Sequence, residues 1–397
     1  MPQPAIVSRP TQRTSSESLY EQALERLPGG NTRTSIFVSP RPPYAARGDG
    51  FTLTDVDGHT VIDLQNNMTA LVHGHRHPAV VAAVTEAVAD GLSFGLPTAA
   101  EVELADELTR RIAAVERIRF GNSGTEAVMS ALRIARAHTG RPAILRFAGA
   151  YHGTYDPILP DGAPGVPEAT WGDVVTVPFD DTGAFRDAVA RHGQRLAAVV
   201  ADLMPNRPGL VPAGEEFARA LRDETERRGI VLIVDEVITF RLGTGGLHGE
   251  YGIRPDLVTL GKTIGGGLPV GAVGGRAEIM AVTDPREQGY VEHGGTFTAN
   301  PLTMRAGLAA LQALDAAEID RINALGELLR LRLTGLGYEV NGRGSLLRLA
   351  APAAERLWWS LYRAGVLIAR NGLACISTPM DESTIEEIVE RVGRAAA

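Results

Sequence analysis

The sequence predicts an α/β fold in which a large domain is built on a mostly parallel sheet and a smaller α+β domain follows it. The main observation is an alternation, from about residue 78 to residue 262, of short apolar runs with longer stretches of helical periodicity. Strands and helices that alternate in this way form a parallel sheet covered on both faces. At 397 residues the chain is also long enough for two domains and a substantial core.

The N-terminal part is expected to hold a polar arm, a short helix and a hairpin. Ser18, followed three residues later by Glu21, has the form of a capping box and predicts that a helix opens there. The Pro-Gly-Gly run at 28–30 ends this helix. Residues 51–64, with an Asp-Gly pair at their centre, predict a β-hairpin.

The alternating region then supplies the large domain. Apolar runs bounded by turn residues predict its strands, and stretches opened by proline or a capping residue predict its helices. The strands are expected at 117–120, 143–147, 197–203, 230–235 and 256–260, and the helices from 78, from 99, at 123–139, near 184 and near 215. After residue 300 a long helix leads to strands at 346–349 and 373–377. The expected domains are residues 1–64, an arm and hairpin that pack with the small domain, residues 65–300, the large domain, and residues 301–397, the small domain.

Charge and composition argue against several classes of protein. Lysine and arginine number 39 against 47 acidic residues, a formal charge of -8, and no block of like charges points to nucleic acid or to a membrane surface. Cys375 is the only cysteine, so an intrachain disulfide is excluded. The first residues have no apolar core, and no uncharged stretch approaches the roughly 20 residues of a membrane helix. We therefore expect a soluble cytoplasmic protein, and we expect no metal.

The first segment that carries chemistry joins the strand at 117–120 to the next helix and reads Gly-Asn-Ser-Gly-Thr-Glu-Ala. Ser123 and Thr125 offer hydroxyl groups, and Gly124 lets the backbone approach a ligand closely. The free N–H groups of a first helical turn favour an anion. An ordinary helix cap explains the same residues equally well, because Asn or Ser followed by Glu is common at helix starts.

The second feature is Asp235, which ends an aliphatic run at 231–234. A carboxylate at the end of a buried strand is unfavourable unless a cation or strong donors accompany it. A protonated pyridine ring supplies both, because its charged nitrogen is held by the acid at its edge. A metal-binding acid or a structural salt bridge is the alternative, although no His or Cys cluster with ligand spacing lies nearby.

The third feature is Lys262, which stands where the strand at 256–260 ends. Its Gly-Lys-Thr context resembles the tail of a P-loop, but that loop needs a glycine where this chain has Asp256. A solvated surface lysine is the default for most lysines, whereas strand ends of this kind form the ligand crevice of α/β sheets. A desolvated lysine loses proton affinity and becomes a nucleophile that forms Schiff bases. Phosphate site, acid and lysine together are what pyridoxal phosphate requires.

These motifs are similar to those of a known family. The chain resembles the class III aminotransferases, which are pyridoxal-phosphate enzymes of fold type I, and within them the subgroup of glutamate-1-semialdehyde aminomutases and β-amino acid aminotransferases. The similarity runs from about residue 28 to residue 304 and weakens beyond. It is carried by GNSGTEA at 121–127, AYHGTYD at 150–156, VLIVDEV at 231–237, LGKTIGGGLPVGAVGG at 260–275 and GTFTANP at 295–301.

The resemblance implies two catalytic residues and a phosphate site. Lys262 is implied as the lysine that forms the Schiff base with the cofactor, and Asp235 as the partner of the pyridine nitrogen. The cofactor phosphate is implied to lie on Ser123, Gly124 and Thr125.

The resemblance also implies the surroundings of the cofactor ring. Tyr151, a third catalytic residue, is implied to stack on one face with His152 beside it, and Val237 to lie against the other face. Thr296 is implied to reach the phosphate of the neighbouring subunit's cofactor, which makes a homodimer with shared active sites the functional unit.

Departures from the aminomutase pattern bear on the reaction. The loop at 154–171 looks shorter than the mobile loop with which aminomutases retain their intermediate, which favours a transaminase. Ser35 falls where those enzymes place a carboxylate-binding arginine, and Arg33 stands two residues earlier, as in aminotransferases that act on β-amino acids. Arg33 is the first candidate for the substrate carboxylate and Arg370 the second, although either is equally readable as a surface arginine. Asp-Leu at 202–203 replaces a usual Glu-Pro, with no consequence that the sequence indicates.

Three functions stay open. The favoured one is an aminotransferase that moves an amino group between an amino acid, β-amino acids included, and a keto acid or aldehyde through a Lys262 Schiff base, with the cofactor alternating between pyridoxal and pyridoxamine phosphate. In it Lys262 moves the proton and Asp235 keeps the ring an electron sink. The runner-up is a glutamate-1-semialdehyde-type 2,1-aminomutase. The third is a non-catalytic cofactor-binding or regulatory module. The sequence does not indicate which donor or acceptor is used.

Overall fold

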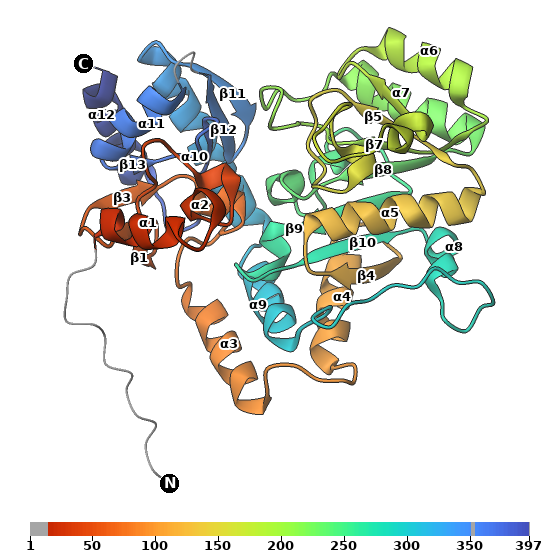
Figure 1. The fold of residues 1–397 in the computed structure, drawn as a ribbon, viewed down its shortest axis with the longest axis horizontal. Coiled ribbons are helices and arrows are strands. Elements are labelled where there is room, and N and C mark those ends of the chain that lie inside the picture. Colours follow the sequence, from red (N-terminus) through yellow and green to blue (C-terminus); the bar gives the residue numbers. More distant parts are fainter. Residues whose placement is uncertain (1–14, 351–353, 397) are drawn as a thin grey trace.

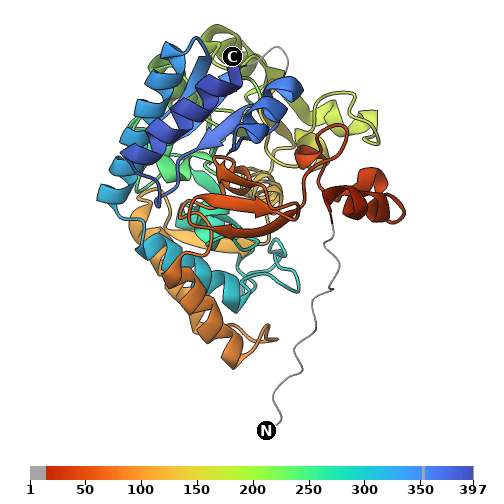
Figure 2. The same ribbon diagram turned by 90° about the vertical axis from the view of Figure 1, so that its left-hand side faces the viewer.

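The computed structural model describes residues 15–350 and 354–396. Figures 1 and 2 show a large sheet with helices around it, beside a group of elements formed by both ends of the chain. None of the helices in the described ranges is long and apolar enough to cross a membrane.

The large sheet has the strand order β4-β10-β9-β8-β7-β5-β6. All neighbouring strands are parallel except β10, which runs antiparallel to both β4 and β9. The prediction of a mostly parallel sheet is therefore confirmed. The strands are β4 (Arg117–Gly121), β5 (Ala143–Phe147), β6 (Val174–Val177), β7 (Leu196–Ala201), β8 (Val231–Asp235), β9 (Leu257–Gly261) and β10 (Gly271–Gly275).

Both faces of the sheet are covered, because successive residues of one strand enter different apolar clusters. Leu232 packs in the cluster that contains Phe185 and Phe217, and the next residue, Ile233, packs in the cluster that contains Leu132. The first cluster lies under α6 (Thr182–His192) and α7 (Glu215–Arg228), and the second under α5 (Gly124–Thr139).

Further helices cover the β4 edge and the connections of the large sheet. α9 (Pro301–Gln312) packs against α3 (Pro78–Asp90) and α4 (Ala99–Arg111). The shorter elements are η3 (Asp156–Ile158), η4 (Glu168–Asp173), η5 (Thr239–Leu242), η6 (Leu247–Gly249), η7 (Lys262–Gly265), α8 (Ala277–Met280) and η8 (Ala281–Thr283).

The two ends of the chain meet in one of two smaller sheets. In a four-stranded sheet, β3 from the N-terminal hairpin pairs in parallel with β13 from the C-terminal part, and a three-stranded sheet has the order β11-β12-β14. The strands are β1 (Ala45–Asp49), β2 (Thr52–Asp55), β3 (Thr60–Asp63), β11 (Glu339–Arg343), β12 (Leu346–Ala350), β13 (Val366–Leu367) and β14 (Leu373–Cys375). The helices are α1 (Ser16–Leu24), η1 (Pro28–Gly30), η2 (Thr34–Ile36), α2 (Asn66–Thr69), α10 (Ala316–Gly335), α11 (Ala354–Arg363) and α12 (Glu382–Ala396). The domain boundaries at 64/65 and 300/301 stay predictions.

Two expectations about helices are wrong. The first helix opens before Ser18, because Ser15 is its cap and the Ser15 hydroxyl accepts a hydrogen bond from the Ser18 N–H at 3.1 Å. The long helix expected after residue 300 is two helices, α9 and α10, and the second begins at a new cap, Asp315, whose carboxylate accepts from the Glu318 N–H at 2.8 Å.

Candidate active site

The site lies where the strands of the large sheet end and α5 begins. β8 ends in Asp235, β9 ends just before Lys262, and β7 ends just before Asp202. Because these neighbouring strands are parallel, their carboxyl ends lie at one edge of the sheet. The cavity at this edge is lined by Gly124, Thr125, Tyr151, His152, Gly153, Asp202, Asp235, Val237, Ile238, Lys262 and Val270.

Asp235 is held in place by three donors. One carboxylate oxygen accepts from the Thr259 hydroxyl at 3.0 Å and from the Val237 N–H at 3.1 Å. The other oxygen lies 2.7 Å from Nδ1 of His152. Asp235 is only 4 % exposed, so these contacts offset the desolvation of its carboxylate. The metal alternative gains no support, because the described residues contain no group of three or more His, Cys, Asp or Glu that could hold an ion.

One ring nitrogen of His152 has no hydrogen-bond partner in the described residues. The ring is buried, and in the described part of the chain its Nε2 has no hydrogen-bond partner. When Nδ1 carries the proton and donates to Asp235, Nε2 is a buried acceptor without a partner in the described residues, on a side chain whose residue lines the cavity. Buried polar atoms of this kind usually have a partner, so the cavity is suited to a polar ligand.

Lys262 occupies a strained position at the end of β9. It is the first residue of η7 and has a φ of 48°, in the left-handed region that a non-glycine residue rarely adopts. Burial lowers the pKa of Lys262, and the charges of Asp235 and Asp202 offset part of that effect. The Lys262 amine is therefore easier to deprotonate than an exposed lysine, as a nucleophile requires.

The N-terminus of α5 is both a helix cap and an open donor site. The Ser123 hydroxyl oxygen accepts from the Glu126 N–H at 3.2 Å, so the helix-cap reading of this segment is correct. The N–H groups of Gly124 and Thr125 belong to the first turn, where helices have no internal acceptors. The fit is tight, since a Cβ on Gly124 would lie 3.1 Å from Val237 and one on Gly153 would lie 2.3 Å from the Thr125 hydroxyl.

A second cavity adjoins the first. Tyr151, Asp202, Ile238 and Lys262 line both, so the same lysine faces both spaces. The second cavity is also lined by Thr34, Ser35, Met68, Asn206, Arg207, Arg348, Arg370, Asn371 and Leu373.

Asp202 is a site residue that the sequence analysis named, as part of the Asp-Leu pair, without assigning it a role. It is buried, one of its oxygens accepts from the Met204 N–H at 2.9 Å, and burial, together with the charge of Asp235, raises its pKa to about 7. Its position at the end of β7, next to the strand of Asp235, was the signal that could have found it.

Three residues predicted for the site lie outside both cavities. Ser123 borders the first through its neighbour Gly124. Arg33 is exposed, and its guanidinium donates to the Asn67 side chain at 2.7 Å. Thr296 is exposed, as a residue that serves another subunit would be. Arg370, in contrast, lines the second cavity.

Comparisons with known proteins agree with this geometry. A family model described as aminotransferase class-III matches residues 38–387. The glutamate-1-semialdehyde 2,1-aminomutase of Thermomicrobium roseum is 44% identical over 356 residues, which cover 84% of this chain and 82% of that protein.

Solved structures are similar over nearly the whole chain. An omega-transaminase from Sphaerobacter thermophilus has a TM-score of 0.92 and 42% identity, covering 96% of this chain and 97% of that one. A transaminase with PLP bound gives the same TM-score and identity, with 96% of each chain covered. A β-phenylalanine aminotransferase from Variovorax paradoxus has a TM-score of 0.89 and 36% identity over 95% of this chain and 92% of that one.

Proposed function

The chain belongs to the class-III aminotransferase family, and from this premise we propose that it is an aminotransferase that moves an amino group between an amino acid and a keto acid or aldehyde. The family uses pyridoxal phosphate and acts on small molecules, so the chain is a pyridoxal-phosphate-dependent enzyme of fold type I. This removes the reading as a non-catalytic module. The proposal rests above all on Lys262, which lines both cavities.

The residues of the first cavity fit this cofactor. The first turn of α5, at Gly124 and Thr125, would hold the phosphate, with the Ser123 hydroxyl free to donate to it. Asp235 would hold the ring nitrogen in its protonated form, and Tyr151 would cover the ring. When bound, the cofactor supplies an aldehyde that accepts amines and a ring that stores electrons.

Lys262 would then move the substrate proton, and Asp235 would control the charge on the cofactor ring. Lys262 would carry the cofactor until the substrate amine displaces it. Its freed amine would then take the proton from the substrate carbon that bears the amino group and pass it to the cofactor, and the lowered pKa of Lys262 favours the uncharged Nζ that this role requires. Asp235 would be held in position at the ring nitrogen because Thr259, Val237 and His152 all contact its carboxylate.

Two arginines are candidates for the substrate carboxylate. Arg370 lines the same cavity as Lys262, whereas Arg33 only adjoins Thr34 and Ser35 of that lining and is turned to Asn67. We therefore propose Arg370 as the first partner, and Arg33 as a partner only if it leaves Asn67. β-Amino acids stay among the candidate substrates, because a β-phenylalanine aminotransferase is similar over 95% of this chain.

We also propose that the enzyme is a homodimer. α3 consists mostly of alanine and valine, yet none of its residues is fully buried in the described chain, although the helix packs against α9. Leu96 at 79% exposure, between α3 and α4, and Phe297 at 64%, beside Thr296, add further exposed apolar surface. Apolar surface of this extent indicates an interface. A second copy would cover it and bring Thr296 toward the partner's site.

A 2,1-aminomutase is the second candidate, favoured by the name of the Thermomicrobium roseum relative. The two are separated by supplying the purified enzyme with an amino donor and measuring release of the donor's keto product against added acceptor. An aminotransferase releases keto product in proportion to the acceptor consumed. Isomerisation of glutamate-1-semialdehyde without net keto release would instead establish the aminomutase. Lys262→Ala is the control that should lose both activities.

A further inference from the structure

The second cavity holds more positive charge than a single substrate carboxylate balances. Arg207, Arg348 and Arg370 all line it, and Asp202 is the one acid among the lining residues that the structure describes. None of the three guanidinium groups forms an ion pair within the described ranges. The cofactor phosphate does not account for them, because its proposed site at the start of α5 lines the other cavity.

Asp202 neutralises only part of this charge. Because burial raises its pKa to about 7, a substantial share of the Asp202 carboxyl groups is protonated at neutral pH. Even a fully ionised Asp202 and one substrate carboxylate on Arg370 would leave one guanidinium unbalanced. The charge of the lining therefore favours a ligand with more than one negative charge.

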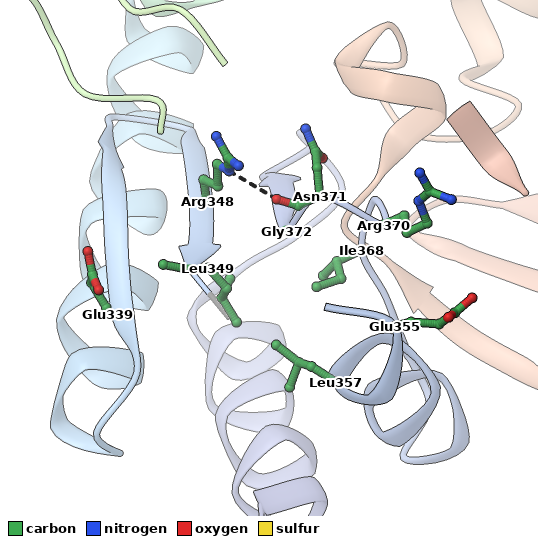
Figure 3. Close-up of a pocket in the computed structure, with 10 residues that line it drawn as sticks. Glu339, Arg348, Leu349, Glu355, Leu357, Ile368, Arg370, Asn371 and Gly372 are labelled. Carbon is green, nitrogen blue, oxygen red and sulfur yellow. Dashed lines mark hydrogen bonds between the residues drawn. The ribbon is translucent and has the colours of Figure 1, made fainter. Parts of the chain in front are cut away.

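Arg348 donates hydrogen bonds to backbone carbonyl groups rather than to an acidic side chain. It lies on β12, and its guanidinium donates to the carbonyl oxygens of Asn206, of Arg207 at 2.7 Å, and of Asn371 at 2.9 Å. Figure 3 is a close-up of a neighbouring pocket that Arg348, Arg370 and Asn371 also line, and it shows Arg348 beside Asn371, with Arg370 on the other side of Asn371. Burial lowers the pKa of Arg348, so its charge is partly desolvated without a counter-ion. These bonds fasten the loop after β7, which carries Arg207, to the small sheet.

Arg207 is exposed, and its guanidinium lies over the Tyr151 ring. The central carbon lies 4.1 Å from the centroid of the Tyr151 ring, which is a cation–π contact. Stacking uses the face of a guanidinium and leaves its N–H edge free for two parallel hydrogen bonds to a carboxylate. Tyr151 also lines the cofactor cavity, so a group bound at Arg207 would lie beside the reacting end of the substrate.

We propose that Arg207, positioned by Arg348, binds a second carboxylate of the substrate, so that the preferred keto acid or amino acid is a dicarboxylate. This rests on the proposed function only in taking the second cavity as the place where the substrate binds. Arg207 is then a specificity-determining residue, Arg348 a positioning residue, and Arg370 the partner of the first carboxylate.

The test compares two acceptors of equal length, 2-oxopentanedioate and 2-oxopentanoate, with the holoenzyme and one amino donor. Arg207→Gln should lower kcat/KM for the dicarboxylate about 10-fold or more, the usual effect of losing a charge-assisted hydrogen bond, and change the monocarboxylate less than about threefold. Arg207→Lys should recover only part of the loss, because an ammonium lacks the planar fork. Arg219→Gln, which removes an exposed arginine paired with Glu215 on α7, is the matched control and should change neither acceptor.

Arg348 is tested through the same ratio. Arg348→Gln should lower the dicarboxylate preference, and the double variant with Arg207→Gln should lower it no further than Arg207→Gln alone, because both changes remove one interaction. A purely structural Arg348 would lower activity toward both acceptors equally and would leave the ratio unchanged, which contradicts the positioning role.

A binding measurement separates this inference from the proposed function. Pentanedioate and pentanoate do not react, so their affinities for the holoenzyme are measured by calorimetry without turnover. We expect pentanedioate to bind more tightly, and Arg207→Gln to remove the difference. The inference about Arg207 is overturned if the enzyme transaminates 2-oxopentanoate and the Arg207→Gln variant keeps the full dicarboxylate preference. The proposed aminotransferase activity is supported by the same result. If pentanedioate binding depends on Arg207 but no acceptor is transaminated, the inference about Arg207 is supported and the proposed aminotransferase activity is overturned.

Discussion

Replacing Asp235 with asparagine changes one charge at nearly constant volume. In the proposed mechanism this charge holds the proton on the ring nitrogen of the cofactor, and a neutral amide does not. General acid–base and electrostatic contributions at such sites are worth roughly 100-fold or more in rate. We therefore expect Asp235→Asn to keep the fold and much of the bound cofactor and to lose turnover by about that factor.

The contacts of Asp235 indicate the structural side effect of this change. The asparagine oxygen still accepts from Thr259 and Val237, as the aspartate oxygen does at 3.0 and 3.1 Å. The new NH₂ group faces Nδ1 of His152, which lies 2.7 Å from the other aspartate oxygen. Two donors then meet, unless the histidine moves its proton to Nε2. We expect a loss of about 1–3 kcal/mol in the free energy of unfolding, the usual effect of one unsatisfied buried polar group.

A matched variant separates the catalytic loss from the structural one. Asp256 is also 4% exposed and precedes the neighbouring strand, but its partners are Arg222, Arg276 and the Leu232 N–H. Asp256→Asn should therefore lower the free energy of unfolding without lowering kcat per bound cofactor.

The assay combines kcat, cofactor absorbance after dialysis, and urea unfolding for both variants. Turnover of Asp235→Asn within a few-fold of the parent, with cofactor still bound, would show that Asp235 is not the partner of the ring nitrogen. An equal loss of kcat in Asp256→Asn would show that general destabilisation is enough to explain the effect.

Three further outcomes are expected. Borohydride reduction followed by peptide mapping should place the cofactor on Lys262, and a label on any other lysine contradicts the assignment. Arg370→Lys should lower kcat/KM for an amino acid relative to its decarboxylated analogue about 10- to 150-fold, and Arg33→Lys should lower it less; the reverse order makes Arg33 the carboxylate partner. Because burial raises the pKa of Asp202 from 3.8 to about 7, its contribution to stability is full at low pH and is lost as pH rises through 7. The free energy of unfolding of Asp202→Asn, measured relative to the parent by urea titration, should therefore increase from pH 5 to pH 8, and a pH-independent difference would mean that Asp202 does not titrate in this range.

The sequence predicted most of the large sheet because its strands are continuous apolar runs. β5, β7, β8 and β9 are buried along their whole length, which is the pattern that hydrophobicity detects. β10 was missed because it reads Gly-Ala-Val-Gly-Gly. A Cβ on Gly271 would lie 1.9 Å from the Ser123 carbonyl oxygen, so this strand uses glycine to let the start of α5 approach, and glycine is not a strand signal.

The two cavities also differ in how far the sequence predicts them. The residues proposed for the cofactor stand at strand ends and at one helix start, so short motifs in the sequence already identify them, and parallel pairing brings their strand ends together. The second cavity is assembled between sheets. Arg207 follows β7 of the large sheet, and the Arg348 that holds its carbonyl comes from β12 of the small sheet, 141 positions further along the chain. No local pattern signals such a contact, because a single arginine has the same appearance in the sequence on a surface and in a cavity.

Because most residues of the second cavity do not line the cofactor cavity, substrate specificity can change without a change in cofactor binding. A substitution at Arg207 or Arg348 alters the charge of the second cavity without touching the hydrogen bonds of Asp235 or the start of α5. Cofactor binding and substrate preference should therefore vary independently in this chain. Tyr151 is one of the four residues that line both cavities, and it also carries Arg207 over its ring. Changes at Tyr151 should affect cofactor affinity and dicarboxylate preference together, whereas changes at Arg207 should affect the second alone.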